Sequence, residues 1–473
     1  MLKNKKLVYY ALGPILGGIF QLISIQFMSW FFDSLYVGMF SLIMVASIFF
    51  ISIFTLGLDQ SFAREFHVSR NKTALLVHST MPGILFLSLI GGSIFYLNSS
   101  IISFSLFEIY STQLSAFIFL TIIFEFFNRF LTIQMRMYED AFKYALSQIF
   151  PRIAFLSLLI IFFVIFKFER NIFFLSFVYM LSVFFTLLFV LKESLIYFDK
   201  PVSKIDKNLL KKLFKFGAPL IFSAIAMWTI NYFDKVVLRY TSQFDQLALL
   251  SIALTLSYIA TFFSSVFNTI WTPLAYKWHS SNVNMKIIKL IASDAMFFML
   301  LIILLCISFS WIFPLLFPAF YADIQFLFVA AVFGPFLYTL SEITGIGIAL
   351  KRKTSFYILI STASSILGIL FALYLIPLYG AKGAALSVMT SYMCFFILRT
   401  YISMNYLLKI NGNVFSVSSI FMYITITVFL FFGELLPYYF FILIFAFTCL
   451  FSWLNSDKFI NLFNVFRNKE LFD

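Results

Sequence analysis

The stretch KESLIYFDKPVSKIDKNLLKKLFK, residues 192–215, is the most charged part of a chain that is 62% hydrophobic and 11% charged. It holds seven lysines with apolar residues between them, a pattern typical of an amphipathic segment on a membrane surface. Six apolar runs precede it and eight follow, each long enough to cross a bilayer, which takes roughly 20 apolar residues. The stretch therefore indicates where a membrane protein is divided in two.

The fourteen predicted spans use nearly the whole chain of 473 residues and leave little room for a soluble catalytic domain. A water-soluble fold is excluded, because soluble proteins carry about a quarter charged residues. The spans are predicted at 8–31, 37–58, 75–97, 114–135, 143–166, 172–191, 215–238, 247–271, 287–313, 325–349, 355–376, 382–402, 415–433 and 436–454.

Positive charge alternates between the connections. Of the 33 lysines and arginines, 26 lie in the N-terminal segment and in every second connection after it. Loops rich in lysine and arginine stay in the cytoplasm, so both termini are predicted to be cytoplasmic. The net charge of +13 then reflects orientation and attraction to anionic membrane lipid, and no nucleic-acid partner is predicted.

Short matches recur across the lysine-rich stretch. Residues 11–16 (ALGPIL) resemble 216–221 (FGAPLI), and residues 142–147 resemble 355–361, at offsets of 205 and 213. Two parallel repeats of six spans predict a site between the halves. We expect an all-α polytopic membrane protein with two six-helix bundles around a central cavity and an extra C-terminal pair. The predicted parts are an N-terminal bundle (1–192), a cytoplasmic amphipathic linker (193–214), a C-terminal bundle (215–408), and a helix pair with a cytoplasmic tail (409–473).

Three cations are counted with the spans themselves and not with the adjoining connections: Arg129, Arg152 and Lys235. A charge within a span costs at least about 2.5–3.5 kcal/mol. Arg152 has no acid three or four positions away, which favours an anionic ligand, because guanidinium binds phosphate through two parallel hydrogen bonds. A structural ion pair with another helix is the alternative. Lys235 and Arg239 share a helix face, so they either bracket an anion or extend to the external headgroups. Arg64 is predicted to be interfacial, at the cytoplasmic end of the second span.

Five acids are candidates for ion coupling or gating: Asp59, Glu125, Asp234, Asp294 and Glu342. Glu125 and Arg129 are four residues apart and form either a neutralising pair within one helix or two parts of a cavity wall. Asp294 and Glu342 are isolated in apolar surroundings. They are predicted either to bind a coupling proton or to make structural hydrogen bonds.

No cofactor, metal site or catalytic motif is predicted. The three cysteines, Cys306, Cys394 and Cys449, are isolated, and the three histidines are scattered. The sequence contains no phosphate-cradling loop and no nucleophile elbow. Any uphill transport would therefore use an ion gradient or a downstream consumer.

Four stretches carry a family resemblance: 36–42 (YVGMFSL), 57–65 (GLDQSFARE), 216–220 (FGAPL) followed by Asp234 and Lys235, and 376–385 (IPLYGAKGAA). Through them, with the fourteen spans and the long linker, the whole chain resembles the Wzx-type O-antigen flippases. These belong to the multidrug/oligosaccharidyl-lipid/polysaccharide (MOP) exporter superfamily.

The resemblance implies alternating-access transport of an undecaprenyl-pyrophosphate-linked oligosaccharide to the outer leaflet of the bacterial inner membrane. The process would be lipopolysaccharide or O-antigen biosynthesis, with a polysaccharide polymerase and a chain-length regulator as possible partners. The predicted contacts of the anionic substrate are Arg64, Arg129, Arg152, Lys235 and Arg239.

Two other functions remain open. An ion-coupled multidrug exporter of the same superfamily is expected to have twelve spans and an acid-dominated cavity. A membrane enzyme, such as a polymerase or an acyltransferase, is expected to have a sizeable external loop with catalytic residues. The largest external segment here, 97–113, contains one acid, Glu108, and no lysine, arginine or histidine.

Overall fold

The computed structural model describes residues 2–167, 169–198, 205–241, 243–258, 287–351, 353 and 355–455, and also 260, 261, 264, 267, 271, 274–276 and 278. Every regular element in this part of the chain is a helix. The predicted fold class is confirmed: the chain is an all-α polytopic membrane protein. Part of the predicted eighth span, part of the linker and the tail 456–473 lie outside the described residues.

The described helices cover the predicted spans. Eleven are long and apolar enough to cross a membrane. One of these, 355–408, contains both the predicted eleventh and the predicted twelfth span, with non-helical backbone at Gly380 between them. Two shorter apolar helices, Phe244–Leu256 and Tyr438–Leu454, lie in the predicted eighth and fourteenth spans.

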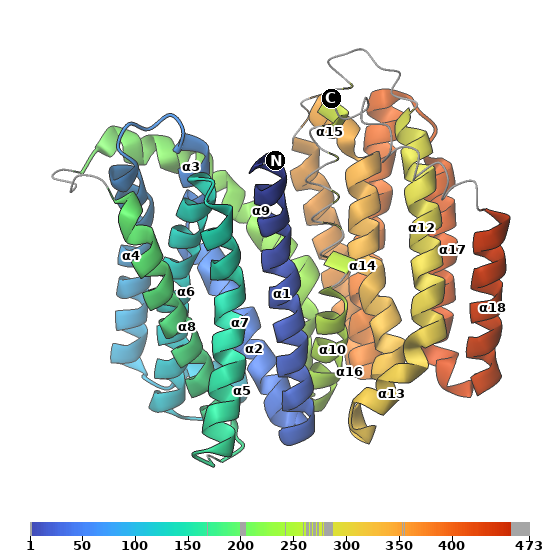
Figure 1. Ribbon diagram of the computed structural model, residues 1–473, viewed down its shortest axis with the longest axis horizontal. Coiled ribbons are helices and arrows are strands. Elements are labelled where there is room, and N and C mark those ends of the chain that lie inside the picture. The colour runs from blue at the N-terminus through green and yellow to red at the C-terminus, as the bar shows by residue number, and fades with distance from the viewer. Residues whose placement is uncertain are drawn as a thin grey trace. The chain divides into compact units, whose positions relative to one another are not determined.

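The chain forms two compact units, Met1–Ala248 and Leu249–Asp473. In the first unit, α1 packs along α7 and α6 packs along α8 (Figure 1). The predicted seventh span lies in α9, which packs on α2 and α3 and so belongs to this unit by its contacts. The sequence predicts a division at the linker, 193–214, between two repeats of six spans. This division stays a prediction. The helices are α1 (Leu2–Phe31), α2 (Ser34–Phe54), α3 (Leu58–Glu65), α4 (Lys72–Leu97), α5 (Ile101–Phe107), α6 (Thr112–Met137), α7 (Ala141–Val164), α8 (Ile172–Ser194) and α9 (Lys207–Tyr240).

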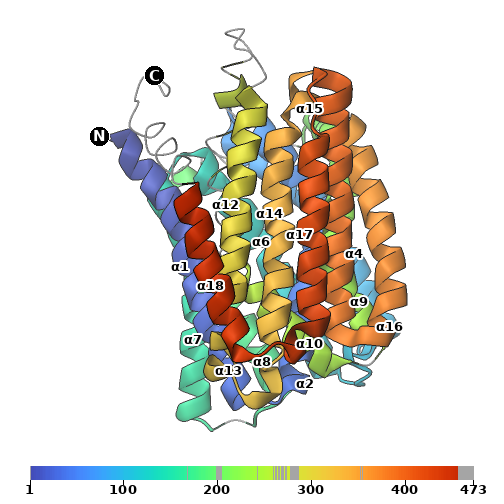
Figure 2. The ribbon, with the colours of Figure 1, turned by 90° about the vertical axis from the view of Figure 1, so that its right-hand side faces the viewer.

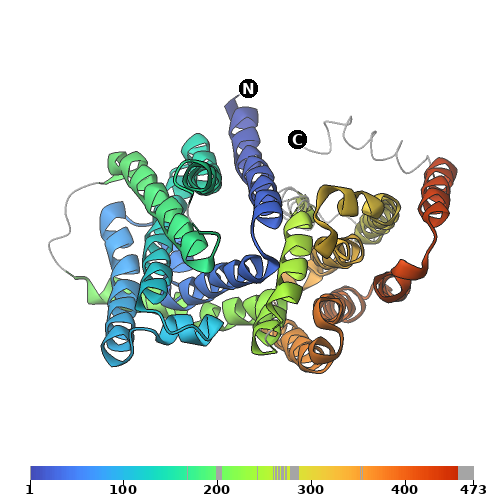
Figure 3. The same ribbon diagram turned by 90° about the horizontal axis from the view of Figure 1, so that it is seen from below.

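In the second unit, α14 is the most buried span and contacts α12, α16 and α17 (Figure 2). The last helix, α18, packs on α12 at the margin of this unit (Figure 3). The helices that follow α9 are α10 (Phe244–Leu256), α12 (Ile287–Phe309), α13 (Phe313–Leu316), α14 (Ile324–Thr344), α15 (Ile346–Leu350), α16 (Ser355–Thr400), the π-helical segment Tyr401–Leu408, α17 (Asn413–Phe432) and α18 (Tyr438–Leu454). Short 3₁₀ segments occur at Leu195–Tyr197, Ser310–Ile312, Ala319–Tyr321 and Gly433–Leu435.

The helix of the predicted second span, 37–58, ends close to its predicted boundary. Leu56 and Gly57 adopt left-handed backbone angles, with φ of 52° and 66°, and they separate α2 from α3. Glycine adopts such angles without steric cost, whereas a residue with a side chain is strained there. The chain is interrupted in the same way between the eleventh and twelfth spans, where Gly380 adopts non-helical angles (φ of 53°, ψ of −127°) and separates two helices within Ser355–Thr400.

The helix α9 begins at Lys207, inside the predicted linker. The Asp206 side chain caps it by accepting hydrogen bonds from the Asn208 and Leu209 amides at 2.9 and 3.1 Å. The buried His78 of α4 accepts the Asp206 amide proton at 2.7 Å. These bonds fix the start of α9 against the N-terminal unit.

Candidate functional site

A polar cavity of about 410 Å³ lies within the N-terminal unit. Its walls come from α1, α2, α3, α6, α7 and α8. Three arginines line it together with one acid, and the polar remainder consists mainly of amide and hydroxyl side chains. The charged residues are Arg129, Arg136, Arg152 and Glu125, and the amides are Gln21, Gln60, Asn128 and Gln148.

Arg129 of α6 forms an ion pair with Asp59 of α3. Its Nη2 and Nε lie 2.7 and 3.1 Å from the same carboxylate oxygen, Oδ2. The Arg129 side chain is 48% exposed, whereas that of Asp59 is 5% exposed. The acid is thus enclosed by protein, and the guanidinium faces the cavity that it lines.

Glu125 lies one turn before Arg129 on α6 but does not pair with it. Its Oε1 accepts a hydrogen bond of 2.5 Å from the Tyr179 hydroxyl of α8. The alternative of a neutralising pair within the helix is therefore wrong. Glu125 and Arg129 are both wall residues of the cavity, with separate partners.

Arg152 of α7 lines the same cavity. Its Nη1 donates a 2.7 Å hydrogen bond to the Gln148 carbonyl one turn earlier. A Cβ atom on Gly17 of α1 would lie 2.5 Å from that nitrogen, so the absence of a side chain at Gly17 makes room for the guanidinium. The Arg152 side chain is therefore accommodated at the close contact between α1 and α7.

Aromatic rings form another side of the cavity. Phe40 and Phe155 are stacked with ring centroids 5.2 Å apart, and Tyr179 meets both rings edge-on at 5.4 and 5.9 Å. All three residues line the cavity. This apolar surface next to arginines and amides suits a ligand with both a charged group and a ring face.

The other predicted site residues of the first unit lie away from the cavity lining. Asp234 and Lys235 are adjacent, buried residues of α9. Arg239 is buried and forms an ion pair of 3.0 Å with Glu108, the single acid of the segment 97–113 that is predicted to be external. The exposed Arg64 lies over the Phe216 ring, 4.2 Å from its centroid.

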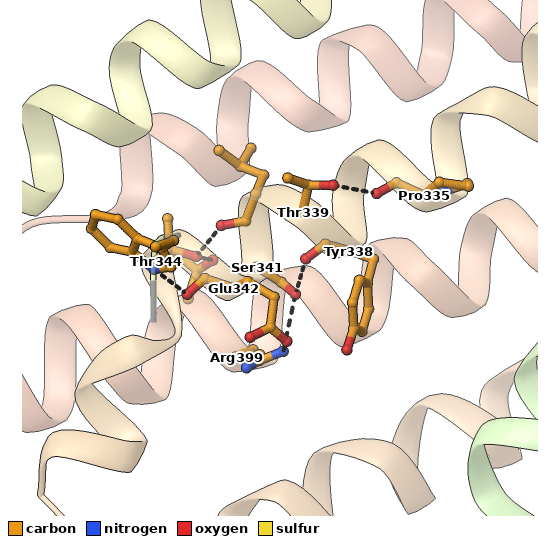
Figure 4. A network of polar contacts seen from close by, with 10 residues as sticks. Pro335, Tyr338, Thr339, Ser341, Glu342, Thr344 and Arg399 are labelled. Carbon is orange, nitrogen blue, oxygen red and sulfur yellow. Dashed lines mark hydrogen bonds and ion pairs between the residues drawn. The ribbon is translucent and has the colours of Figure 1, made fainter. Parts of the chain in front are cut away.

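In the second unit, Glu342 of α14 pairs with Arg399 of α16. The Arg399 Nη1 lies 2.5 Å from Glu342 Oε1 and 3.3 Å from the Ser341 hydroxyl, as Figure 4 shows. The side chains are only 6% and 18% exposed, Arg399 being the more buried. Glu342 is therefore not an isolated acid. Asp294 lies half-buried in α12.

Two arginines were missed by the sequence reasoning. Arg136 lines the cavity and Arg399 forms the buried pair, but both lie near the cytoplasmic ends of predicted spans. Each was assigned to a positively charged connection for that reason. Arg136 directly follows the predicted fourth span (114–135), and Arg399 lies in the last turn of the predicted twelfth span (382–402). This nearness to the membrane interior was the available signal.

No protein-family model matches the chain, and no curated protein matches its sequence. The fold, however, is shared with solved transporters. A lipid II flippase, MurJ, in an inward closed conformation matches with a TM-score of 0.69 at 14% identity, over 96% of this chain and 99% of that one. An inward-facing multidrug resistance transporter of the MATE family, in the MOP superfamily, matches with a TM-score of 0.58 at 16% identity, over 84% and 93%. An outward-facing MATE transporter gives 0.57 at 15% identity. The chain therefore has the fold of the MOP superfamily transporters.

Proposed function

We propose that the protein is a flippase for a lipid-linked oligosaccharide, which binds the anionic phosphate groups of its substrate in the N-terminal cavity. The observation that carries this proposal is the lining of that cavity by three arginines and one acid. A pyrophosphate crossing a medium of low dielectric constant needs fixed positive charge, and guanidinium groups match phosphate geometry. Arg129 and Arg152 are the proposed contacts.

The size of the cavity limits what it holds. Pockets for small molecules have volumes of about 300–1,000 Å³, so 410 Å³ suits a pyrophosphate with its first sugar. The aromatic wall of Phe40, Phe155 and Tyr179 is the proposed sugar-facing surface. The lipid tail stays in the bilayer during alternating access, and it needs no enclosed space in the protein.

The fold likeness supports transport over an enzymatic role, since the matching solved proteins are transporters. It also favours a flippase, because the solved lipid II flippase covers 96% of this chain and the MATE transporters 84%. We propose further that the substrate is an undecaprenyl-pyrophosphate-linked O-antigen or similar repeat unit. The location would be the bacterial inner membrane with both termini cytoplasmic, and a polymerase and chain-length regulator would act downstream.

The second candidate is an ion-coupled multidrug exporter. Glu125 favours it, because a carboxylate in the cavity wall is the group that a cationic drug or a coupling proton needs. Three arginines in the same cavity oppose it, since they repel a cationic ligand.

The test is a deletion strain complemented with the wild type, with Arg152→Ala, and with Arg170→Ala as a matched control. Arg170 lies over the Phe163 ring and is not among the cavity residues. A flippase predicts lost surface polysaccharide on gels and repeat units trapped in the inner leaflet, restored by the wild type and by Arg170→Ala but not by Arg152→Ala. Normal polysaccharide with raised sensitivity to cationic drugs would instead establish the exporter. Units already flipped but not polymerised would point to a polymerase.

A further inference from the structure

The pairing of Arg129 with Asp59 uses only one edge of the guanidinium. Nε and Nη2 both donate to Asp59 Oδ2, which is a side-on arrangement. Among the described residues, Nη1 has no hydrogen-bond partner, and the side chain is about half exposed. The end-on edge, formed by Nη1 and Nη2, is therefore left for a ligand. That edge offers two parallel N–H groups, which a phosphate binds at once.

The position of Asp59 depends on the turn between α2 and α3. Leu56 and Gly57 turn the chain in the left-handed region, and Asp59 then falls in the first turn of α3. A carboxylate is favoured at a helix N-terminus, which adds to its ion pair. In an unbroken helix Asp59 would continue the direction of α2, and its reach to Arg129 would be lost.

The helix α3 is fastened to α9 on one side. Three side chains make the connection: Ser61 donates to the Leu213 carbonyl at 2.8 Å, Glu65 pairs with Lys212, and Arg64 lies over the Phe216 ring. The backbones also meet at Gly57 and Gly217, where a Cβ on Gly217 would lie 2.8 Å from both the Gly57 carbonyl oxygen and the Ser61 hydroxyl. Any change in the position of α9 therefore moves α3, and with it Asp59.

We propose that Asp59 is a positioning residue for substrate: it holds Arg129 side-on so that Nη1 and Nη2 face the cavity, and α3 makes this geometry depend on α9. The inference rests on the proposed function, since it assigns the phosphate of the substrate to the free edge of Arg129. The affinity of the cavity for a phosphate group is then set by a helix outside its lining.

The test measures binding of inorganic pyrophosphate to the purified full-length protein by calorimetry. Asp59→Asn keeps the size of the side chain and removes its charge, and we expect binding about tenfold weaker, the equivalent of one charge-assisted hydrogen bond. Gly217→Ala displaces α3 without touching the cavity, and we expect a loss of similar size. The double variant should bind no more weakly than Asp59→Asn alone, because both changes act through the same pair.

Gly92→Ala is the control, since a Cβ at Gly92 meets nothing within 4 Å. If Gly217→Ala reduces the yield of folded protein, Ser61→Ala replaces it and removes the hydrogen bonds from the Ser61 hydroxyl to the Leu213 and Gly57 carbonyls. A merely structural role of Asp59 would lower the melting temperature and leave the dissociation constant unchanged, and additive losses in the double variant would also overturn the inference. If wild-type protein does not bind pyrophosphate, or binds it independently of Arg129, the proposed function itself fails.

Discussion

Each unit of the molecule contains an arginine–carboxylate pair that joins two helices, and the two pairs differ in which partner is exposed. In the pair of Arg129 and Asp59 the arginine is 48% exposed and the acid is enclosed. In the pair of Glu342 and Arg399 the arginine is 6% exposed. A charge within a span is therefore not enough to identify a binding site. What matters is whether the guanidinium has a free edge on a cavity.

The surroundings of Arg399 explain why it is enclosed. The rings of Tyr357 and Phe395 lie 5.1 and 5.5 Å from its guanidinium carbon. Gly345 leaves space that a Cβ would take from the Arg399 side chain. The pair is thus held by aromatic faces and by close backbone approach, which favours a structural role.

The largest effect is expected for Arg399→Ala. It leaves Glu342 without its ion-pair partner in a mostly buried position, and we expect a loss of about 3–5 kcal/mol in the free energy of unfolding. The measurements are the melting temperature of the purified protein and its abundance in membranes. The double variant Glu342→Gln/Arg399→Met should recover most of the loss. A stable Arg399→Ala protein without transport would show that the two pairs have the same role.

Arg129→Gln, in the other pair, should reduce the stability of the protein only moderately but abolish its transport function. The amide still donates to Asp59, so we expect a loss of stability of about 1–3 kcal/mol, smaller than that of Arg399→Ala. Surface polysaccharide in the complemented deletion strain should nevertheless disappear, because the free edge of the guanidinium is gone. Unfolding as severe as that of Arg399→Ala, at equal expression, would contradict the difference between the pairs.

Tyr179→Phe should have a smaller effect. It removes the hydrogen bond to Glu125, whose carboxylate lines the cavity and can be solvated from it, so we expect about 1 kcal/mol. Chemical denaturation of the purified protein measures this change. A loss of stability comparable to that of Arg399→Ala would mean that Glu125 is as poorly solvated as the buried pair of Arg399 and Glu342.

The smallest effect is expected for Lys382→Gln. Lys382 of α16 pairs with Glu434, which lies in the connection before α18 and has a side chain that is 54% exposed. Exposed ion pairs contribute roughly 0–1 kcal/mol, so stability should barely change. A large loss would indicate that the C-terminal helix pair depends on this contact.

Hydropathy predicted the spans well, because each crossing needs a long apolar run whatever its neighbours are. It also placed the end of the second span, at residue 58, close to the turn at Leu56 and Gly57, but it could not predict the contact of Gly57 with Gly217 of α9. The cavity was predictable only in part. Arg129 and Arg152 were identified from their depth in the spans, and both line it.

The pairings themselves were beyond local reasoning. Spacing along one helix suggested Glu125 as the partner of Arg129, whereas the partner is Asp59, 70 residues away in sequence. Arg399 was assigned to a connection, although its contact with Glu342 brings it into the buried interior of the second unit. Such contacts depend on how the helices pack against one another, and the spacing of residues along one helix does not predict that packing.

The order of the residues in each pair has a consequence during synthesis. In both pairs the acid is made first: Asp59 precedes Arg129 by 70 residues, and Glu342 precedes Arg399 by 57. At a synthesis rate of roughly 5–20 residues per second, the acid waits several seconds for its arginine. A carboxyl group can neutralise itself by binding a proton, whereas an arginine keeps its charge. The acid of each pair therefore enters the membrane before its arginine has been made, and it is the acid that can do so in an uncharged form.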